Sequence, residues 1–128
     1  MTGEIEALAN VAVDCGFHIH KDIGPGLLES AYEVLLVESL SRRGLAVERQ
    51  VPVSLKANGI VIDNAFRADV FVERTLLIEV KSTEAHAPVH AKQLLTYLRL
   101  MNLPLGLLMN FGAGTFKEGI RRIANNHV

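Results

Sequence analysis

The feature that most constrains the fold is a change in the pattern of apolar residues at Gly44. Before Gly44, apolar residues recur every three or four positions, which is typical of amphipathic helices. From Leu45 to Val80, short runs of valine, isoleucine and leucine are separated by turn residues, which is typical of strands. Because such a chain buries a sheet against helices, we predict an α/β domain with a central mixed sheet.

The helical pattern occurs in four segments. Gly24-Pro25-Gly26 separates the first two, because proline fixes its φ angle and the flanking glycines permit tight turns. Pro88 suits the first turn of the third helix. The expected helices are about Glu4–Ile19, a segment from just after Gly26 to Ser41-Arg42-Arg43-Gly44, Val89–Met101, and a basic helix over Phe116–Ala124.

Turn residues divide the strand-rich region. Asn58-Gly59 is a strong hairpin signal because both residues tolerate positive φ angles, and Glu73-Arg74-Thr75 and Asp63-Asn64 are expected to be short turns as well. The expected strands are Leu45–Leu55, Ile60–Ile62, Phe66–Val72, Leu76–Val80 and a buried strand at Leu105–Phe111. Since no internal repeat or linker is present, we expect a single domain over residues 1–128.

Composition narrows the functional classes. Thirteen basic and fourteen acidic residues give a formal net charge of −1, so any surface for nucleic acid has to be local. No stretch approaches the roughly 20 continuous apolar residues of a membrane span. The first twenty residues lack the basic start and cleavage site of a secretory signal, so we expect a cytoplasmic protein with no membrane partner. Cys15, the only cysteine, excludes disulfides within the chain and is interpreted as a small core residue.

Charged residues interrupt the apolar pattern of two neighbouring strands, Phe66–Val72 and Leu76–Val80. Alternate side chains of a strand face opposite sides, so Asp69 and Glu79 are expected on the face opposite the apolar core side. If the three-residue turn pairs the strand ends directly, Asp69 lies opposite Glu79 with Cβ atoms about 5 Å apart. Two such carboxylates repel unless a positive charge lies beside them, and Lys81 on the same face is one such charge.

A divalent metal ion is the other candidate counter-charge. Carboxylate oxygens suit Mg²⁺ or Mn²⁺, which are commonly held by one or two carboxylates together with waters and substrate phosphate oxygens. Such a site predicts metal-assisted hydrolysis of a phosphodiester bond, in which the Lys81 ammonium orients the water or neutralises developing charge. The alternative interpretation is a solvated strand pair in which Asp69, Glu79 and Lys81 form a weak surface salt bridge.

Two helical segments carry polar residues that share a face. Glu29 lies three residues from both Gly26 and Tyr32, and Gln93 lies four residues from Tyr97. The segment Gly26-Leu27-Leu28-Glu29-Ser30-Ala31-Tyr32 resembles the G-x-x-E-x-x-Y signature of the GxxExxY proteins, a family assigned to the PD-(D/E)XK nuclease superfamily. The resemblance continues in order through His20, Arg49-Gln50-Val51-Pro52, Arg67-Ala68-Asp69, Glu79-Val80-Lys81, Gln93-Leu94-Leu95-Thr96-Tyr97 and Asn110-Phe111.

The resemblance implies the restriction-endonuclease-like αβββαβ core of that superfamily, with the first and last helices as additions. The site residues that it implies are Asp69, Glu79 and the Val80 carbonyl as metal ligands, Glu29 as the helical glutamate that completes the metal site, Lys81 as the superfamily lysine, and Gln93 as the glutamine of the later helix. Ala68 stands where many members have a proline, and Asp63 in the preceding turn is the alternative carboxylate ligand.

The histidines have competing interpretations. His86 and His90 are four residues apart, as zinc ligands on a helix are, but Pro88 lies between them and no third ligand is evident. His18 and His20 flank the glycine-rich turn, where packing or capping is favoured over catalysis.

Two tyrosines and one glycine-rich segment also have two interpretations each. Tyr32 and Tyr97 either stack on a nucleic-acid base or lie in the core with their hydroxyl groups hydrogen bonded. The Gly24-Pro25-Gly26 segment lacks the lysine and serine of a phosphate-binding loop, so we interpret it as a turn.

The sequence therefore predicts a small Mg²⁺- or Mn²⁺-dependent nuclease that acts on DNA or RNA. The alternative is a catalytically silent module on a nuclease fold that binds nucleic acid or protein. Near-zero net charge and few aromatic residues argue against an efficient stand-alone nuclease. A homodimer would gather the scattered cations around one groove; these are Arg42, Arg43, Arg49, Arg67, Lys92, Arg99, Lys117, Arg121 and Arg122.

Overall fold

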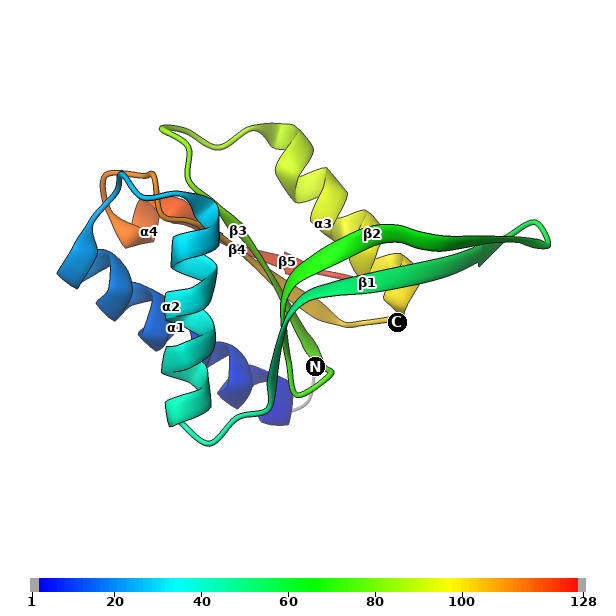
Figure 1. Cartoon of the computed structure of the whole chain (residues 1–128), viewed down its shortest axis with the longest axis horizontal. Coiled ribbons are helices and arrows are strands. Elements are labelled where there is room, and N and C mark those ends of the chain that lie inside the picture. Colours follow the sequence, from blue (N-terminus) through cyan, green and yellow to red (C-terminus); the bar gives the residue numbers. More distant parts are fainter. Residues whose placement is uncertain (1–2, 127–128) are drawn as a thin grey trace.

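A five-stranded mixed sheet forms the centre of the molecule, as the computed structural model of the chain describes it over residues 3–126 (Figure 1). The strands lie in the order β1-β2-β3-β4-β5; β3 and β4 are parallel and the other neighbours are antiparallel. The elements are α1 (Gly3–Ile23), α2 (Glu29–Arg42), β1 (Val47–Ala57), β2 (Ile60–Val72), β3 (Leu76–Lys81), α3 (Pro88–Met101), β4 (Leu105–Asn110), α4 (Phe116–Gly119) and β5 (Ile120–Ala124). The segment from α2 to β4 has the predicted αβββαβ order.

Helices cover both faces of the sheet. Figure 1 shows α1 and α2 on one side and α3 on the other. On the α1 and α2 side, Val70, Ile78 and Leu107 of the strands join Leu36 of α2 in one buried cluster. On the other side, Leu94 and Leu98 of α3 pack in a second cluster with further strand residues. The parallel pairing of β3 with β4 requires a crossover connection, and α3 provides it.

The expectation that only one face of β2 and β3 is apolar is wrong. Phe71 and Leu77, which the alternation assigns to the same face as Asp69, are buried under α3. Ala68 also belongs to the α3 cluster although Val70 belongs to the opposite one, so the regular alternation breaks at Asp69. The carboxylate therefore lies at an irregularity between two apolar layers.

The hairpin of β1 and β2 is longer than predicted. Asp63-Asn64 is no turn, because β2 continues through it. Instead β2 bulges there: Val53 pairs with Phe66 and Leu55 with Ile62, so residues 63–65 of β2 lie opposite Ser54 alone. The predicted Asn58-Gly59 turn is confirmed, with φ angles of 53° and 76°. Figure 1 shows the outer half of this hairpin projecting beyond the helices.

The predicted basic helix over Phe116–Ala124 is also wrong. Only Phe116–Gly119 is helical, and β5 follows it directly, antiparallel to β4. A strand is favoured here because the outer edge of β4 needs hydrogen-bond partners, and because β-branched Ile120 and Ile123 suit a sheet. Within residues 3–126, no helix is long and apolar enough to span a bilayer.

Candidate active site

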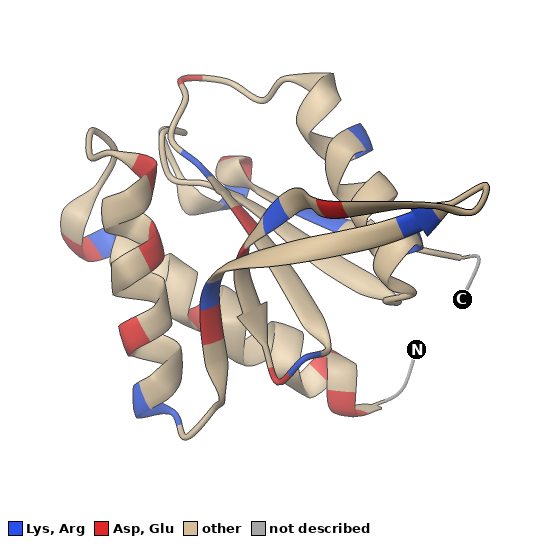
Figure 2. Ribbon diagram, turned by 45° about the vertical axis from the view of Figure 1, so that its right-hand side comes forward, with Lys and Arg blue, Asp and Glu red and all other residues tan. Residues whose placement is uncertain are grey.

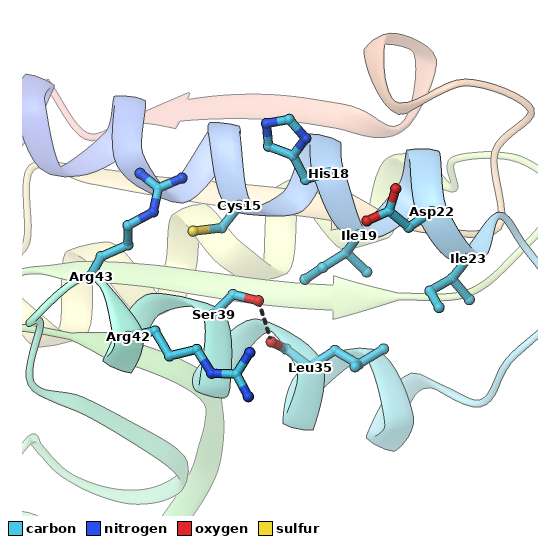
Figure 3. A pocket seen from close by; sticks show the side chains of 9 residues that line it. All are labelled: Cys15, His18, Ile19, Asp22, Ile23, Leu35, Ser39, Arg42 and Arg43. Atoms are coloured by element: carbon cyan, nitrogen blue, oxygen red, sulfur yellow. Dashed lines mark hydrogen bonds between the residues drawn. The ribbon is translucent and has the colours of Figure 1, made fainter.

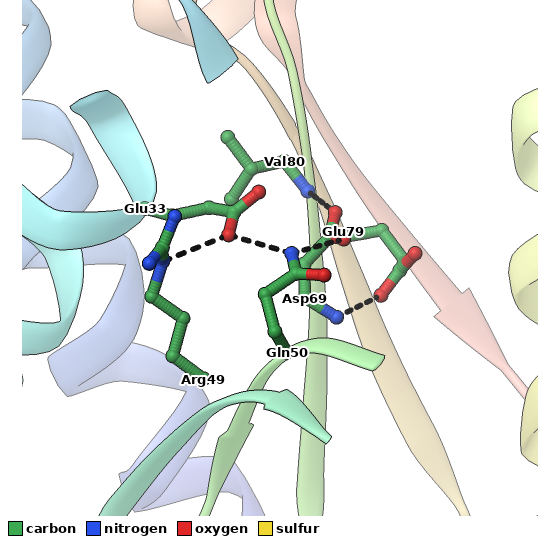
Figure 4. Close-up of polar contacts among 6 residues, drawn as sticks. All are labelled: Glu33, Arg49, Gln50, Asp69, Glu79 and Val80. Atoms are coloured by element: carbon green, nitrogen blue, oxygen red, sulfur yellow. Dashed lines mark hydrogen bonds and ion pairs between the residues drawn. The ribbon is translucent and has the colours of Figure 1, made fainter. Parts of the chain in front are cut away.

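Asp69 and Glu79, which we call the carboxylate pair, lie where β2 and β3 separate. The backbone pairing runs from Val72 with Leu76 to Val70 with Ile78, in the predicted register, and then stops. Beyond this point, hydrogen bonds from backbone N–H groups to carboxylate side chains take the place of the backbone-to-backbone hydrogen bonds between the strands (Figure 4). The Asp69 N–H donates to Glu79 Oε2 at 3.0 Å, and the Val80 N–H donates to Asp69 Oδ2 at 2.8 Å. Each carboxylate thus reaches across to the backbone of the other strand.

Burial disfavours the charged form of both carboxyl groups of this pair and so raises their pKa values. Glu79 is only 4% exposed, and loss of hydration together with the nearby Asp69 charge raises its pKa to about 8. Asp69 is half-buried, and loss of hydration raises its pKa to about 6, although the hydrogen bond from Val80 opposes the shift. Both carboxyl groups therefore lie in an environment that favours a cation or a proton.

Lys81 ends β3 beside the carboxylate pair. Its side chain is half-buried, and its positive charge lowers the pKa of both Asp69 and Glu79 against the stronger effect of burial. The backbone is fixed by the Lys81 carbonyl, which accepts from the N–H of Phe111 at 2.9 Å. The end of β3 thus holds a cation next to two desolvated carboxylates.

The other predicted site residues differ in how they relate to this pair. Glu29 is the half-buried first residue of α2, and its negative charge raises the pKa of Asp69. Gln93 is exposed on α3 and makes no side-chain hydrogen bond in the described structure. Val80 meets Asp69 through its N–H, so its carbonyl as a metal ligand stays a prediction. Asp63 lies on the exposed half of β2, about 20 Å along the strand from Asp69.

The donor atoms fit a hard divalent cation better than they fit zinc. Over residues 3–126, no three His, Cys, Asp or Glu side chains are placed so that together they would hold a metal ion. The carboxylate pair still offers what Mg²⁺ or Mn²⁺ needs from a protein, namely one or two carboxylates, and a cation between them would relieve their repulsion. Glu29, the next acidic group, is an electrostatic neighbour of Asp69.

Sequence reasoning missed a second polar layer behind Asp69 (Figure 4). Glu33 of α2 is only 5% exposed. It accepts hydrogen bonds from Arg49 Nε at 3.0 Å and from Gln50 Nε2 at 2.8 Å. Gln50 Nε2 also lies 3.4 Å from Asp69 Oδ1. The available signal was the position of Glu33 one helical turn after Glu29.

Tyr32 is a structural residue. Its ring is fully buried and stacks on Phe111 with centroids 4.6 Å apart. Its hydroxyl donates to the Gly24 carbonyl at 2.5 Å and accepts from the Leu27 N–H at 3.2 Å. The core interpretation of Tyr32 is confirmed, and the Gly24-Pro25-Gly26 segment is the turn that this hydroxyl closes. Tyr97 stacks on Phe66, with centroids 3.8 Å apart.

His20 and His86 make structural hydrogen bonds, whereas His90 is a neighbour of the candidate site. His20 is buried and bonded to the Ala113 carbonyl at 2.8 Å, so its predicted packing role is confirmed. His86 Nε2 lies 3.0 Å from the Glu118 carbonyl oxygen. Nδ1 of His90 is buried and has no hydrogen-bond partner. Burial lowers the pKa of His90, and the positive charge of Lys81 lowers it further, so His90 is an electrostatic neighbour of that lysine.

Two hollows lie outside the carboxylate pair. A cavity of about 350 Å³ between α1 and α2 is lined by Cys15, Leu35, Arg42 and others, none of them a predicted site residue (Figure 3). Burial raises the pKa of the Cys15 thiol, as expected of the predicted core cysteine. A second hollow, of about 420 Å³, lies between the turn before α2 and the Ser82–Glu84 loop that follows Lys81.

The fold and the site together define a class of protein. An αβββαβ core that carries an aspartate on one strand and Glu-x-Lys on the next has the arrangement expected of the PD-(D/E)XK nuclease fold. A model of the PD-(D/E)XK nuclease superfamily matches residues 6–123, and the chain belongs to this superfamily. A comparison with curated proteins finds no match.

Proposed function

We propose that this chain is a nuclease that hydrolyses phosphodiester bonds of DNA or RNA with Mg²⁺ or Mn²⁺. The observation that carries the proposal is the carboxylate pair: two desolvated carboxyl groups with raised pKa values on adjacent strands, beside Lys81. Membership of the nuclease superfamily supports the same reaction class. Repulsion within a buried pair costs stability, and strongly perturbed carboxyl groups of this kind cluster at functional sites.

Each residue of the site has a separate role in the proposed reaction. Asp69 and Glu79 would hold a divalent cation, which when bound would supply a water of lowered pKa and positive charge for the phosphate. The N–H groups of Asp69 and Val80 hold the carboxylates in orientation. Lys81 would supply an ammonium where negative charge builds on the phosphate, which would stabilise the transition state more than the ground state.

The hollow beside Lys81 is the proposed approach for the nucleic-acid backbone. It is lined mainly by small and polar residues, including Gly26, Ser82 and Gly112. Its walls are fixed, because the Ser82 hydroxyl donates to the Leu27 carbonyl at 2.7 Å. Because Ser82 directly follows Lys81 in the chain, a phosphodiester backbone in this hollow would pass near the end of β3.

Within the superfamily, we assign the chain to the GxxExxY proteins. The Gly26-to-Tyr32 signature forms one structural unit here: Gly26 has a φ angle of 121°, and Tyr32 anchors the turn that precedes Glu29. Tyr32 therefore holds the start of the helix on which Glu29 lies. This supports a family motif built to place the glutamate.

A silent binding module is the second candidate function. It is favoured by one observation, that no three metal-ligating side chains converge within the described part of the chain. Such a module would bind nucleic acid equally well with and without a divalent cation.

The test is cleavage of single-stranded, double-stranded and branched DNA and RNA by the purified chain, with Mg²⁺, Mn²⁺ or Ca²⁺. Glu79→Gln should abolish cleavage and also the rise in melting temperature caused by Mn²⁺. Glu38→Gln is the matched control, because Glu38 is exposed on α2 and has no contact with the site. Binding without cleavage in every metal would favour the silent module.

A further inference from the structure

Gln50 adopts a backbone conformation that is unusual for a residue inside a strand. Its φ angle is 53°, in the left-handed region that glycine favours and glutamine rarely adopts. Its neighbours pair regularly with β2, Arg49 with Val70 and Val51 with Ala68, whereas Gln50 has no partner in the ladder. The position that it would face is Asp69. Strained backbone of this kind is typical of functional sites.

The left-handed turn changes where two consecutive side chains point. Neighbouring residues of a regular strand face opposite sides of the sheet. Arg49 and Gln50 instead reach the same oxygen, Oε1 of Glu33, at 3.0 and 2.8 Å (Figure 4). The backbone strain is thus coupled to a specific polar contact inside the protein.

The amide of Gln50 also faces the carboxylate pair. Its Nε2 lies 3.4 Å from Asp69 Oδ1, while Asp69 Oδ2 is held by the Val80 N–H at 2.8 Å. Both oxygens of Asp69 therefore have a neighbouring donor from a different strand. Nε2 stands between the carboxylates of Glu33 and Asp69, where its hydrogens offset their mutual repulsion.

We infer that Gln50 is a positioning residue for Asp69. It fixes the rotation of the Asp69 carboxylate and its separation from Glu33, so that Asp69 is oriented for a divalent cation before the cation arrives. This inference rests on the proposed function, because orientation of Asp69 matters only if that carboxylate binds a metal. Partners of this kind around metal ligands change metal affinity when they are removed.

Gln50→Gly distinguishes the effect of the Gln50 amide from the effect of the strained backbone. Glycine adopts the left-handed conformation without strain, which partly offsets the loss of the hydrogen bond to Glu33, so the variant should still fold cooperatively, with a melting temperature somewhat below that of the metal-free wild type. Because it loses the amide, it should bind Mn²⁺ about 10- to 100-fold more weakly in calorimetry with the metal alone. In cleavage assays kcat should fall, whereas KM for nucleic acid should change little.

Asn58→Gly is the matched control. Asn58 has the same φ angle of 53° but lies at the tip of the β1–β2 hairpin, away from the carboxylate pair. The Asn58→Gly variant should lose the same backbone strain and keep the Mn²⁺ affinity of the wild type. Gln50→Asn, which tolerates the left-handed conformation and keeps a shorter amide, should fall between wild type and Gln50→Gly.

The outcomes separate this inference from the function on which it rests. Wild-type Mn²⁺ affinity and kcat in Gln50→Gly would overturn the positioning role and leave the nuclease intact. A wild-type chain that binds no Mn²⁺ and cleaves no nucleic acid would overturn the proposed function, and with it the need to orient Asp69. A stable Gln50→Gly protein with weakened Mn²⁺ binding supports the inference.

Discussion

At the scale of single residues, the candidate site is organised around two carboxylates whose burial lowers the stability of the fold. Asp69 and Glu79 are held by backbone N–H groups yet lose most of their hydration, and burial is the largest cause of both pKa shifts. The stability of the metal-free protein should therefore depend on whether these groups carry protons.

The first prediction concerns pH. In the unfolded chain both carboxyl groups titrate near pH 4, and in the folded chain near 6 and 8. Between about pH 4 and 8 the folded state binds more protons, so the free energy of unfolding falls as pH rises. The melting temperature of the metal-free protein should drop by roughly 10 °C or more over this range. Mn²⁺ should raise it more at pH 8 than at pH 6.

Glu79→Gln is the control for this pH effect. The substitution removes the group with the most strongly raised pKa, so the metal-free variant should be more stable than wild type at pH 8 and lose much of the pH dependence. An unchanged pH profile in this variant would contradict the assignment of the effect to the carboxylate pair.

The second prediction concerns Lys81. Lys81→Met keeps most of the stem and deletes the charge that lies beside both carboxyl groups. Single-turnover cleavage should slow by roughly 10²-fold, the loss typical of one electrostatic partner of the transition state. Mn²⁺ binding should persist, because the carboxylates lose an internal competitor for the metal. Lys21→Met, on exposed α1 surface, is the control. Cleavage at the wild-type rate would remove Lys81 from the mechanism.

The local sequence pattern predicted part of the geometry of this candidate site and not the rest. The spacing of Asp69, Glu79 and Lys81 was readable because strand periodicity and a short turn determine which residues lie opposite one another. The contact between Glu33 and Gln50 was not predictable, since it depends on a positive φ angle that no sequence rule assigns to a glutamine inside a strand. The electrostatic closeness of His90 to Lys81 likewise depends on how α3 docks.

At the scale of elements, the start of α2 is placed by a tyrosine. Leu28, which precedes the helix, makes no side-chain cap. The Tyr32 hydroxyl instead bonds two groups of the preceding turn, and the Tyr32 ring is fixed by its stack on Phe111. The turn, Glu29 and the sheet are thus joined through one side chain.

The third prediction tests this anchor. Tyr32→Phe keeps the stacked ring and removes the hydroxyl, leaving the Gly24 carbonyl and the Leu27 N–H without their partner. The free energy of unfolding should fall by about 1 kcal/mol in urea denaturation. Tyr97→Phe is the control, because the Tyr97 hydroxyl makes no hydrogen bond in the described structure and its loss should change stability little. Equal losses in both variants would contradict the anchoring role.

The elements that the sequence analysis assigned wrongly share one physical cause. β5 pairs with β4 through contacts between segments that the local pattern does not reveal, and its short length of five residues carries little periodicity. The continuous β2 also depends on a partner, because it stays paired with β1 on both sides of its bulge at Asn64. In both cases the strand is determined by its neighbour rather than by its own composition.

At the scale of the whole molecule, the charges are dispersed. Lys and Arg are spread over helices and strands in the view of Figure 2, interleaved with Asp and Glu. Several are already paired, Arg49 with Glu33 and Arg74 with Glu48 among them. The α/β class and the order from α2 to β4 were predictable because long periodic segments dominate that region, whereas the docking of charged side chains was not. Cations that contact phosphates would therefore do so from scattered positions rather than from one basic patch.

The fourth prediction follows from this charge distribution. A protein that neutralises many phosphates loses affinity steeply with salt, but this chain has a net charge of −1 and carries its desolvated acidic pair at the proposed site. Affinity for a labelled oligonucleotide, measured by fluorescence anisotropy in Ca²⁺, should therefore depend more on the divalent ion than on KCl between 50 and 200 mM. Asp69→Asn with Glu79→Gln should bind without Ca²⁺ at least as tightly as wild type, because the repulsion between carboxylates and phosphates is gone. Equal wild-type binding with and without Ca²⁺, together with a steep KCl dependence, would instead show that surface cations bind the nucleic acid and that the carboxylate pair takes no part.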